Sequence, residues 1–341
     1  MSSSTSTTAA AQYAGRQQSP LQRVQHALHA KPWLSPLILL VLTYAVFTVV
    51  NPRMINPTVI STNLQQTAVI AALAIGQTLI ILTAGIDLAV GATTILSMMV
   101  MASLAADQGV PAVPAILIGV LLGVAAGYLN GILITKLNLP PFIVTLGTLS
   151  IFTAVALLYS GGSSIIADDM PAGLNLMGVT FFPKSFPITV GMLVVLALYL
   201  IVGFVLSQTA WGRHVYAVGD DPESARLSGV ASKRVLVSVY TLAGLIYGVA
   251  AWVLIGRTGA ATPNAIGDFN LQSITAVVIG GTSLFGGRGA LIGTALGALI
   301  VNTFGQGLSL AGVDQLYRVL ATGILVIVAV AIDQWIRKVK G

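Results

Sequence analysis

Residues 114–134 read PAILIGVLLGVAAGYLNGILI, a stretch of 21 residues without a charged side chain. A helix of about 20 apolar residues spans the hydrocarbon core of a bilayer, so this stretch predicts a transmembrane helix. Comparable apolar segments recur at 33–50, 67–84, 88–105, 142–159, 187–206, 235–256, 271–284, 290–310 and 317–336. We therefore expect an all-α polytopic membrane protein with about ten transmembrane segments.

The composition agrees with this fold class. The 341 residues are 56% hydrophobic and only 8% charged, whereas soluble domains carry about 25% charged residues. This excludes a water-soluble globule and leaves no room for a large soluble catalytic domain. The chain has no cysteine, which excludes disulfides and thiolate metal sites. We expect no catalytic residue, no metal site, no cofactor on this chain and no nucleic-acid partner.

The distribution of basic residues predicts the orientation, because Lys and Arg concentrate on the cytoplasmic side of a membrane protein. With ten crossings and a cytoplasmic N-terminus, twelve of the 16 Lys and Arg fall on the inner side. The outer side then holds Arg53, Lys184, Arg257 and Arg318. Both termini are expected to be cytoplasmic, in a multi-pass protein of the bacterial inner membrane.

Residues 33–336 form the predicted permease domain, preceded by a polar tail at 1–19 and an interfacial amphipathic helix at 20–32. A basic cytoplasmic C-terminus follows at 337–341. The segment 271–284 is too short to cross alone as a straight helix. We expect the second or the eighth segment to be broken.

The polar chemistry limits how transport is driven. Proton-coupled carriers usually place acids or histidines inside their spans, but here no acid lies near the predicted bilayer centre. Sodium bound by backbone carbonyls stays possible. A phosphate-binding loop of the G-x-x-x-x-G-K-[ST] kind is also missing, since Gly-Lys never occurs. If ATP drives transport, the ATPase is therefore a separate chain.

A separate ATPase needs a cytoplasmic feature to contact, and the longest predicted inner loop, 207–234, is the candidate. Asp220 or Asp221 can cap a helix there, Pro222 suits its first turn, and Gly229 can end it. The result is a helix of about two turns at 222–228 on an otherwise flexible loop. A short amphipathic helix of this kind suits docking in a partner's groove, although an ordinary capped loop helix has the same pattern.

Four motifs resemble one known family. They are GIDLAVGATTILSMM (85–99), KLNLPPFIVTLGTLSIFTAVALLYSGG (136–162), WGRHVYAVGDDPESARLSGV (211–230) and AVVIGGTSLFGGRGALIGTALGALI (276–300). Together they resemble the permease subunit of bacterial ABC sugar importers of the ribose, xylose and fructose type. The resemblance runs from about residue 33 to the C-terminus.

The resemblance implies a particular assembly. A second permease subunit, two cytoplasmic ABC ATPase subunits carrying ATP and Mg, and an extracytoplasmic sugar-binding protein would move a monosaccharide by alternating access. It also implies that the loop matching 211–230 contacts the ATPase. The residues that carry this role over are Gly212, Arg213, Asp221, Pro222, Glu223, Ala225, Arg226, Leu227 and Gly229.

Polar residues within or beside the spans are candidates for the translocation path: Asp87, Asn130, Thr145, Thr148, Asn302 and Gln306. Interhelical hydrogen bonds are the commoner fate of such side chains in membranes. Asp87 follows the second span in a glycine-containing turn, where it equally suits the cap of the next helix. Arg288, in the similar turn 286–289, suits an inside-positive anchor.

Two other functions fit the same spans. A stand-alone secondary carrier or facilitator for a small polar solute would need no docking helix, so changes at Glu223 or Arg226 would leave its transport intact. An importer for a non-sugar solute, such as a nucleoside or signalling compound, would show no competition by unlabelled sugars.

Overall fold

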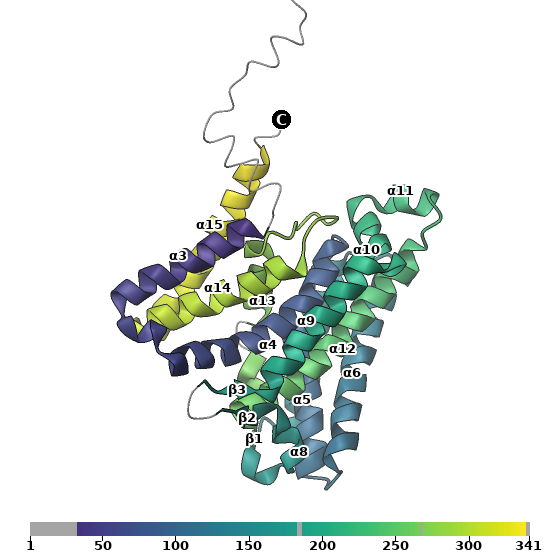
Figure 1. The fold of residues 1–341 in the computed structure, drawn as a ribbon. Helices are drawn as coiled ribbons and strands as arrows, with labels where there is room; N and C mark the ends of the chain where they lie inside the picture. Colours follow the sequence, from purple (N-terminus) through teal and green to yellow (C-terminus); the bar gives the residue numbers. More distant parts are fainter. Residues whose placement is uncertain (1–32, 183–185, 267–268, 339–341) are drawn as a thin grey trace, which may run out of the picture.

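The structure is a computed structural model in which residues 33–182, 186–266 and 269–338 are described (Figure 1). The predicted tail 1–19, the predicted interfacial helix 20–32 and residues 339–341 of the basic C-terminus lie outside these residues, as does Lys184.

Each predicted apolar segment coincides with a helix. Six of these helices are long and apolar enough to cross a membrane: α4 (Pro57–Leu82), α6 (Ala112–Lys136), α7 (Pro141–Ser160), α9 (Val190–Gln208), α12 (Ser232–Thr258) and α14 (Leu291–Leu310). The other four are α3 (Leu34–Val50), α5 (Val90–Ala106), α13 (Phe269–Ile279) and α15 (Gln315–Lys338). The all-α polytopic membrane fold is confirmed.

Helix α4 begins ten residues before the predicted start of the second segment at 67. Asn56 caps it by accepting a 2.9 Å hydrogen bond from the Thr58 amide, and Pro57 occupies its first turn. The added turns are polar in sequence, yet Asn63 is buried and donates to the Thr303 hydroxyl at 2.8 Å. Residues whose polarity suggests a loop are therefore held in the helix by tertiary partners.

Helix α4 lies between two groups of helices, and from Thr67 to Leu82 its residues are buried on every side. On one side α12 packs against α4, α5 and α6, and α7 packs against α5. On the other side α14 packs against α3, α4, α13 and α15. Figure 1 shows α4 crossing between these groups at a steep angle to α6 and α12.

Helix α13 does not span a bilayer. Its 11 residues rise about 16 Å, against a hydrocarbon core of about 30 Å. It ends at Ile279, and a turn leads into α14 at Leu291. The eighth segment is therefore the interrupted one, whereas the second segment is continuous in α4.

The described loops gather at two ends of the molecule. One end, here called the α11 end, holds the turns 83–89 and 280–290, the loop 137–140, helix α10 (Ala210–Asp220) and helix α11 (Pro222–Leu227). The Gly287 amide there donates to the Leu82 carbonyl at 3.0 Å, and Lys233 Nζ donates to Asn138 Oδ1 at 3.2 Å. The alternation of sides predicted from the basic residues agrees with this grouping.

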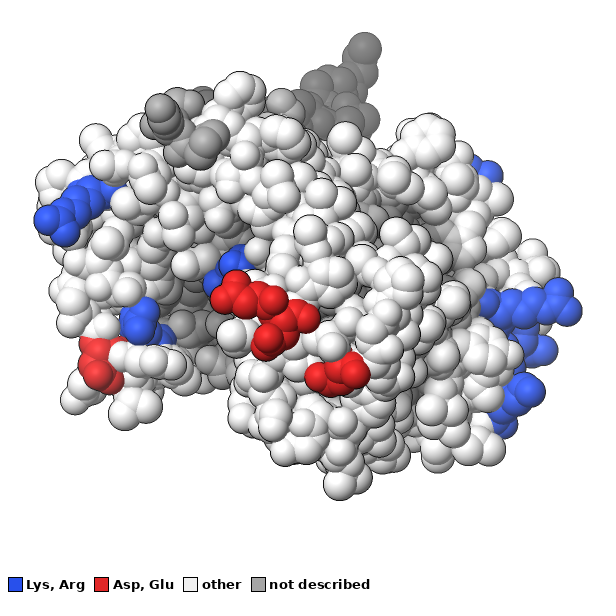
Figure 2. Space-filling view, turned by 90° about the horizontal axis from the view of Figure 1, so that it is seen from below, with Lys and Arg blue, Asp and Glu red and all other residues white. Residues whose placement is uncertain are grey.

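The opposite end is the α8 end, which carries helix α8 (Ala172–Asn175) and the short helices η1 (Pro52–Ile55), η2 (Ala167–Asp169), η3 (Leu176–Gly178) and η4 (Pro263–Ile266). Strand β1 (Ile165–Ile166) pairs antiparallel with β4 (Ala260–Ala261), and β2 (Thr180–Phe181) with β3 (Ile188–Thr189). Asp107 and Asp169 line a hollow of about 400 Å³ at this end. Figure 2, seen from below, shows acidic side chains near the middle of this face, with a basic side chain beside them and further Lys and Arg toward its left and right edges.

Candidate functional site: the α10–α11 contact and a polar pocket

Helix α11 forms where the sequence predicts a capped helix. The Asp221 carboxylate accepts hydrogen bonds from the amides of Glu223, at 2.9 Å, and Ser224, at 3.1 Å, while Pro222 occupies the first turn. After the helix, Gly229 has a φ of +87°, a conformation that glycine adopts without the steric cost of a Cβ. Local sequence therefore fixes both ends of α11.

The surface of α11 is exposed and charged. Arg226 forms a two-pronged ion pair with Glu223, with nitrogen–oxygen distances of 2.6 and 3.0 Å. Leu227 is 76% exposed, whereas Ala225 is buried on the opposite face. The helix thus presents an apolar tip beside an ion pair, away from the body of the protein.

Two carboxylates of this region favour their charged forms. Hydrogen bonds from the Ser224 hydroxyl and amide and from the Glu223 amide lower the pKa of Asp221 below its ordinary value. The hydrogen bond and the positive charge of Arg226 lower the pKa of Glu223. Both groups are therefore anionic at neutral pH, so the cap and the ion pair are in place.

The chain before α11 is a second helix, which corrects the predicted flexible loop. Helix α10 is capped by the Thr209 hydroxyl, which accepts from the Gly212 amide at 3.2 Å. Its buried face consists of Gly212, Val215, Val218 and Gly219. The prediction of a flexible loop overlooked this apolar face, which is short and lies between two glycines.

The C-terminal end of α10 rests on the turns that follow α4 and precede α14. The Tyr216 hydroxyl donates to the Gly289 carbonyl at 2.9 Å. A Cβ at Gly219 would overlap the Leu82 carbonyl oxygen and lie 2.7 Å from the Gly287 amide nitrogen. Gly286 has a φ of +84°, and a Cβ there would lie 2.9 Å from the Ala84 amide nitrogen. Three chain segments therefore meet backbone to backbone.

The predicted coupling residues thus lie on one continuous unit, α10 and α11. Gly212 packs against the end of α9, because a Cβ there would overlap the Leu206 carbonyl. Arg213 is exposed on α10. Tyr216, Gly219, Gly286 and Gly287 were not predicted, although the cluster of glycines at 286–289 was a usable signal for a close backbone contact.

Asp87 and Thr145 meet at the turn between α4 and α5. Asp87 is 2% exposed, and its carboxylate accepts from the Ala89 amide at 2.7 Å. The Asp87 carbonyl accepts from Gln77 Nε2 at 2.9 Å. The Thr145 hydroxyl donates to the Ile86 carbonyl at 3.1 Å. These contacts hold the turn together. The N-cap of α5 is Ala89, so the predicted cap at Asp87 is wrong, and its carboxylate binds the amide of the N-cap residue instead.

Asn130 and Thr148 are also buried, on α6 and α7 respectively. The Thr148 hydroxyl approaches the Thr145 carbonyl of its own helix at 3.4 Å. Asn130 is 1% exposed, and its Oδ1 has no partner among the described residues. Asp87, Asn130, Thr145 and Thr148 therefore do not line the polar pocket that contains Asn302 and Gln306.

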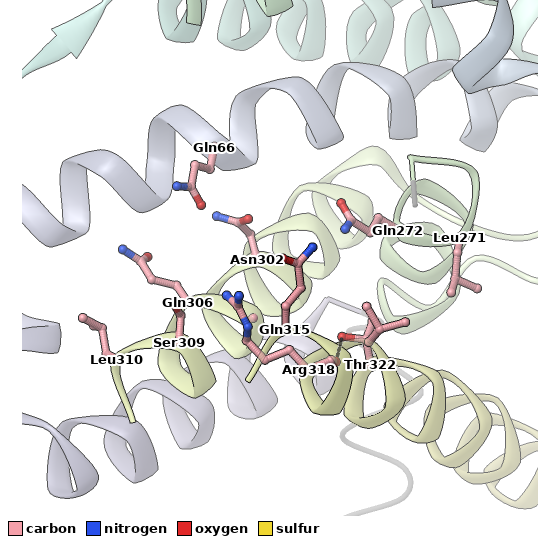
Figure 3. A pocket seen from close by; sticks show the side chains of 12 residues that line it. Gln66, Leu271, Gln272, Asn302, Gln306, Ser309, Leu310, Gln315, Arg318 and Thr322 are labelled. Atoms are coloured by element: carbon pink, nitrogen blue, oxygen red, sulfur yellow. Dashed lines mark hydrogen bonds between the residues drawn. The ribbon is translucent and has the colours of Figure 1, made fainter. Parts of the chain in front are cut away.

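That pocket has a volume of about 470 Å³ and lies between α4, α13, α14 and α15, near the ends of these helices that face the α8 end. Figure 3 shows amide side chains converging from all four helices. Its polar lining consists of Gln66, Gln272, Asn302, Gln306, Ser309, Gln315, Arg318 and Thr322. Only Asn302 and Gln306 of this set were predicted, because the convergence depends on how the helices tilt.

The pocket offers both a free acceptor and a free donor. Asn302 Nδ2 donates to the Asn63 carbonyl at 2.9 Å, and Gln306 Nε2 donates to the Val59 carbonyl at 3.3 Å. Among the described residues, Gln306 Oε1 and Arg318 Nε are buried without a partner. A ligand hydroxyl satisfies both kinds of group, since it donates one hydrogen bond and accepts others.

Comparison with known proteins identifies the kind of molecule this is. Residues 59–330 match the family described as branched-chain amino acid transport system / permease component. The chain is 46% identical, over 98% of its length and 94% of the relative, to the fructose import permease protein FrcC of Rhizobium meliloti. It is 37% identical to the ribose import permease protein RbsC of Bacillus subtilis, over 88% of this chain and 92% of the relative.

A third relative is the D-allose transport system permease protein AlsC of Escherichia coli, which is 38% identical over 80% of this chain and 82% of the relative. These relatives agree with the resemblance seen in the four sequence motifs. The chain is a multi-pass membrane protein and a transporter subunit rather than an enzyme, and it belongs to this family of import permeases.

Proposed function

We propose that this chain is the membrane subunit of an ATP-driven importer that carries a monosaccharide into the cytoplasm. In this proposal the ten apolar helices form the membrane domain in the bacterial inner membrane, both termini are cytoplasmic, and the α11 end faces the cytoplasm. A separate ATPase pair with ATP and Mg docks on α11. A second permease and an extracytoplasmic sugar-binding protein complete the assembly.

The observation that carries this proposal is the contact of α10 with the two turns. Helix α11 has an exposed tip for a partner, and it follows α10 without an intervening loop, because Asp220 ends α10 and Asp221 caps α11. The Gly219 backbone touches both Leu82 and Gly287. A displacement of α11 therefore moves α10, and through the backbone contacts of Gly219 it moves the end of α4 and the turn before α14.

The same two helices reach the pocket at the other end. Helix α4 carries Leu82 at one end and Gln66 in the pocket lining, and α14 starts after the turn at Gly287 and carries Asn302. Movement at the α11 end thus changes the width of the pocket by tilting rigid helices, which is the requirement of alternating access.

A neutral polyhydroxylated solute suits the pocket. Carboxamides and an unpartnered guanidinium nitrogen pair with hydroxyl groups, and no carboxylate among the described residues lines this pocket. The three relatives are named for fructose, ribose and D-allose, which supports a monosaccharide. The α8 end, with the segment 161–182 and the exposed acids Asp168 and Asp169, is where we place the sugar-binding protein.

A pull-down from mild detergent tests the ATPase assignment. We expect the wild-type chain to retain an ABC ATPase and the variant Leu227→Asp to lose it, since a charge replaces the exposed apolar tip. Ile55→Asp, on a residue 62% exposed at the opposite end, is the matched control and should retain the ATPase. The double variant Glu223→Ala/Arg226→Ala should also lose the ATPase. Because an exposed ion pair contributes little to folding, this loss would report a missing contact with the ATPase and not an unfolded chain.

The alternatives predict different outcomes. If no ATPase is retained even after cross-linking in membranes, and transport survives the changes in α11, the chain is a stand-alone carrier. Uptake competition separates the sugar from other solutes, including the amino acids in the family's description. If no unlabelled monosaccharide competes, the sugar assignment is wrong while the ATPase assignment stands.

A further inference from the structure

A groove between α6 and α12 forms a second feature that the transport proposal does not use. It has a volume of about 1050 Å³ and lies on the outer surface of these two helices. Its apolar wall includes Val124, Tyr128 and Ile132 from α6 and Val237, Leu242 and Leu245 from α12. Lys136, Lys233 and Arg234 border the same groove.

The groove follows from the way the two helices pack. Gly123, Gly127 and Gly131 recur every four residues on α6 and let the backbone of α12 approach closely, so that a Cβ at Gly127 would overlap the Tyr240 carbonyl oxygen. The neighbouring stripe, at Val124, Tyr128 and Ile132, is one residue further round the helix. It therefore flanks the contact and forms one wall of the apolar part of the groove, here called the valley.

The wall is apolar even where hydroxyls occur in it. The Thr135 hydroxyl donates to the Gly131 carbonyl at 2.7 Å, and the Thr241 hydroxyl donates to the Val237 carbonyl at 2.7 Å. The Ser238 hydroxyl donates to the Val235 carbonyl and accepts from Trp211 Nε1 at 2.8 Å. These three hydroxyls are satisfied within the protein, and Tyr128, which is 52% exposed, carries the remaining hydroxyl of the apolar wall.

The charges are confined to one end of the valley. Lys136 ends α6, while Lys233 and Arg234 lie in the first turn of α12, and all three are exposed. The ion pair of the described residues is Glu223–Arg226, so none of these three cations is neutralised by a carboxylate there. Cations in the first turn of a helix oppose its dipole, so helix stability does not account for Lys233 and Arg234.

The dimensions match one leaflet of a bilayer. Twelve residues separate Val124 from Lys136 on α6, and twelve separate Lys233 from Leu245 on α12, which is a rise of about 18 Å on each helix. Half of the hydrocarbon core is about 15 Å thick. An acyl chain laid along the valley from its apolar end would therefore place its headgroup at the three cations.

We propose that the groove between α6 and α12 binds one anionic phospholipid, with its phosphate at Lys136, Lys233 and Arg234 and an acyl chain along the apolar valley. Charge complementarity identifies the headgroup, because basic pockets between transmembrane helices at the headgroup level favour anionic lipids. The site adjoins the α11 unit, since the Ser232 hydroxyl at the start of α12 approaches the Pro222 carbonyl at 3.3 Å.

Native mass spectrometry of the delipidated full-length chain tests this site. Titration with dioleoylphosphatidylglycerol should give a bound lipid at least about tenfold more tightly than dioleoylphosphatidylcholine, since each nearby basic residue contributes roughly fivefold. The variant Lys136→Gln/Lys233→Gln/Arg234→Gln should lose the preference. The charge-preserving control Lys136→Arg/Lys233→Arg/Arg234→Lys should keep it. Equal binding of the two lipids by the wild type would overturn the proposal.

A second variant separates a seated lipid from a loosely held anion. Thr241→Trp fills the valley and leaves the three charges in place, so it should weaken phosphatidylglycerol binding, whereas excess inorganic phosphate should not displace the lipid. If inorganic phosphate displaces it fully and Thr241→Trp has no effect, the acyl seat does not exist.

The remaining possible occupant is a second copy of the chain. The chain has no native cysteine, so the single variant Tyr128→Cys reports contacts made at the groove alone. In membranes it should give no disulfide-linked dimer. An efficient cross-link there would show that a protein rather than a lipid covers the groove.

Discussion

The amide of Gly287 donates a 3.0 Å hydrogen bond to the carbonyl of Leu82, which joins the turn before α14 to the last turn of α4. Gly219 lies against both partners of this bond. The end of α10 and the ends of two pocket-lining helices thus meet in a single contact.

Gly219→Val should uncouple the importer. The added side chain overlaps the Leu82 carbonyl and forces α10 away from the turns, while α11 keeps its own cap and ion pair. We expect ATPase binding to persist and ATP-dependent sugar uptake to fall at least about tenfold in reconstituted vesicles. Gly203→Ala on α9 is the control, because a Cβ there meets nothing within 4 Å. Normal uptake by the Gly219 variant would contradict the transmission route.

Tyr216→Phe should have a smaller effect on the same contact. It removes the hydroxyl that donates to the Gly289 carbonyl at 2.9 Å, and a lost hydrogen bond of this kind costs about 1 kcal/mol. We expect a drop of a few degrees in the thermal unfolding midpoint and a reduction of uptake of about two- to fivefold. An unchanged midpoint would mean that water replaces the hydroxyl as the donor to the Gly289 carbonyl.

Asp221→Ala should fray α11. The carboxylate accepts two amide hydrogen bonds at the start of the helix, and loss of such a cap costs about 1 kcal/mol. Amide hydrogen exchange of residues 222–228 should become several-fold faster, and ATPase retention should weaken. Asp221→Asn keeps an acceptor oxygen and should behave almost as the wild type. Equal exchange in all three chains would show that packing rather than the cap holds the helix.

Gln306→Leu should impair sugar recognition without touching the ATPase. The change removes the unpartnered Oε1 from the polar pocket and the 3.3 Å hydrogen bond to the Val59 carbonyl. Loss of one neutral hydrogen bond to a ligand predicts a rise of about three- to tenfold in the sugar concentration for half-maximal uptake. Gln108→Leu is the control, because Gln108 is exposed in the turn after α5 and lies outside this pocket; it should leave that concentration unchanged. Both variants should still retain the ATPase in the pull-down.

Gly127→Val should destabilise the membrane domain itself. Its side chain overlaps the Tyr240 carbonyl and separates α6 from α12. Overpacking of this kind costs about 1–3 kcal/mol, so we expect a lower unfolding midpoint and a lower yield of folded chain. Gly147→Ala on α7, where a Cβ meets nothing within 4 Å, is the control and should behave as the wild type. A stable Gly127 variant would show that the two helices can separate freely.

The sequence predicted the helices better than the pocket. Long apolar runs identify spans such as α6 whatever surrounds them, and the Asp221, Pro222 and Gly229 signals are local, so α11 was predicted almost to the residue. The first turns of α4 were missed because polar residues such as Asn63 are held by partners far away in the sequence. Helix α10 was missed because its apolar face is short and lies between two glycines. Gln66 and Gln315 converge with Asn302 through the tilt of three helices, which no local pattern encodes.

The contact at Gly219 is made by main-chain atoms, whereas the part of α11 offered to a partner is made by the side chains of Glu223, Arg226 and Leu227. Under the proposed function, force transmission and partner choice would therefore reside in different atoms of the same unit. A permease of this design could then change which ATPase it accepts by substitutions on one exposed helix, while the main-chain contact that would convert the ATPase stroke into helix movement stays the same.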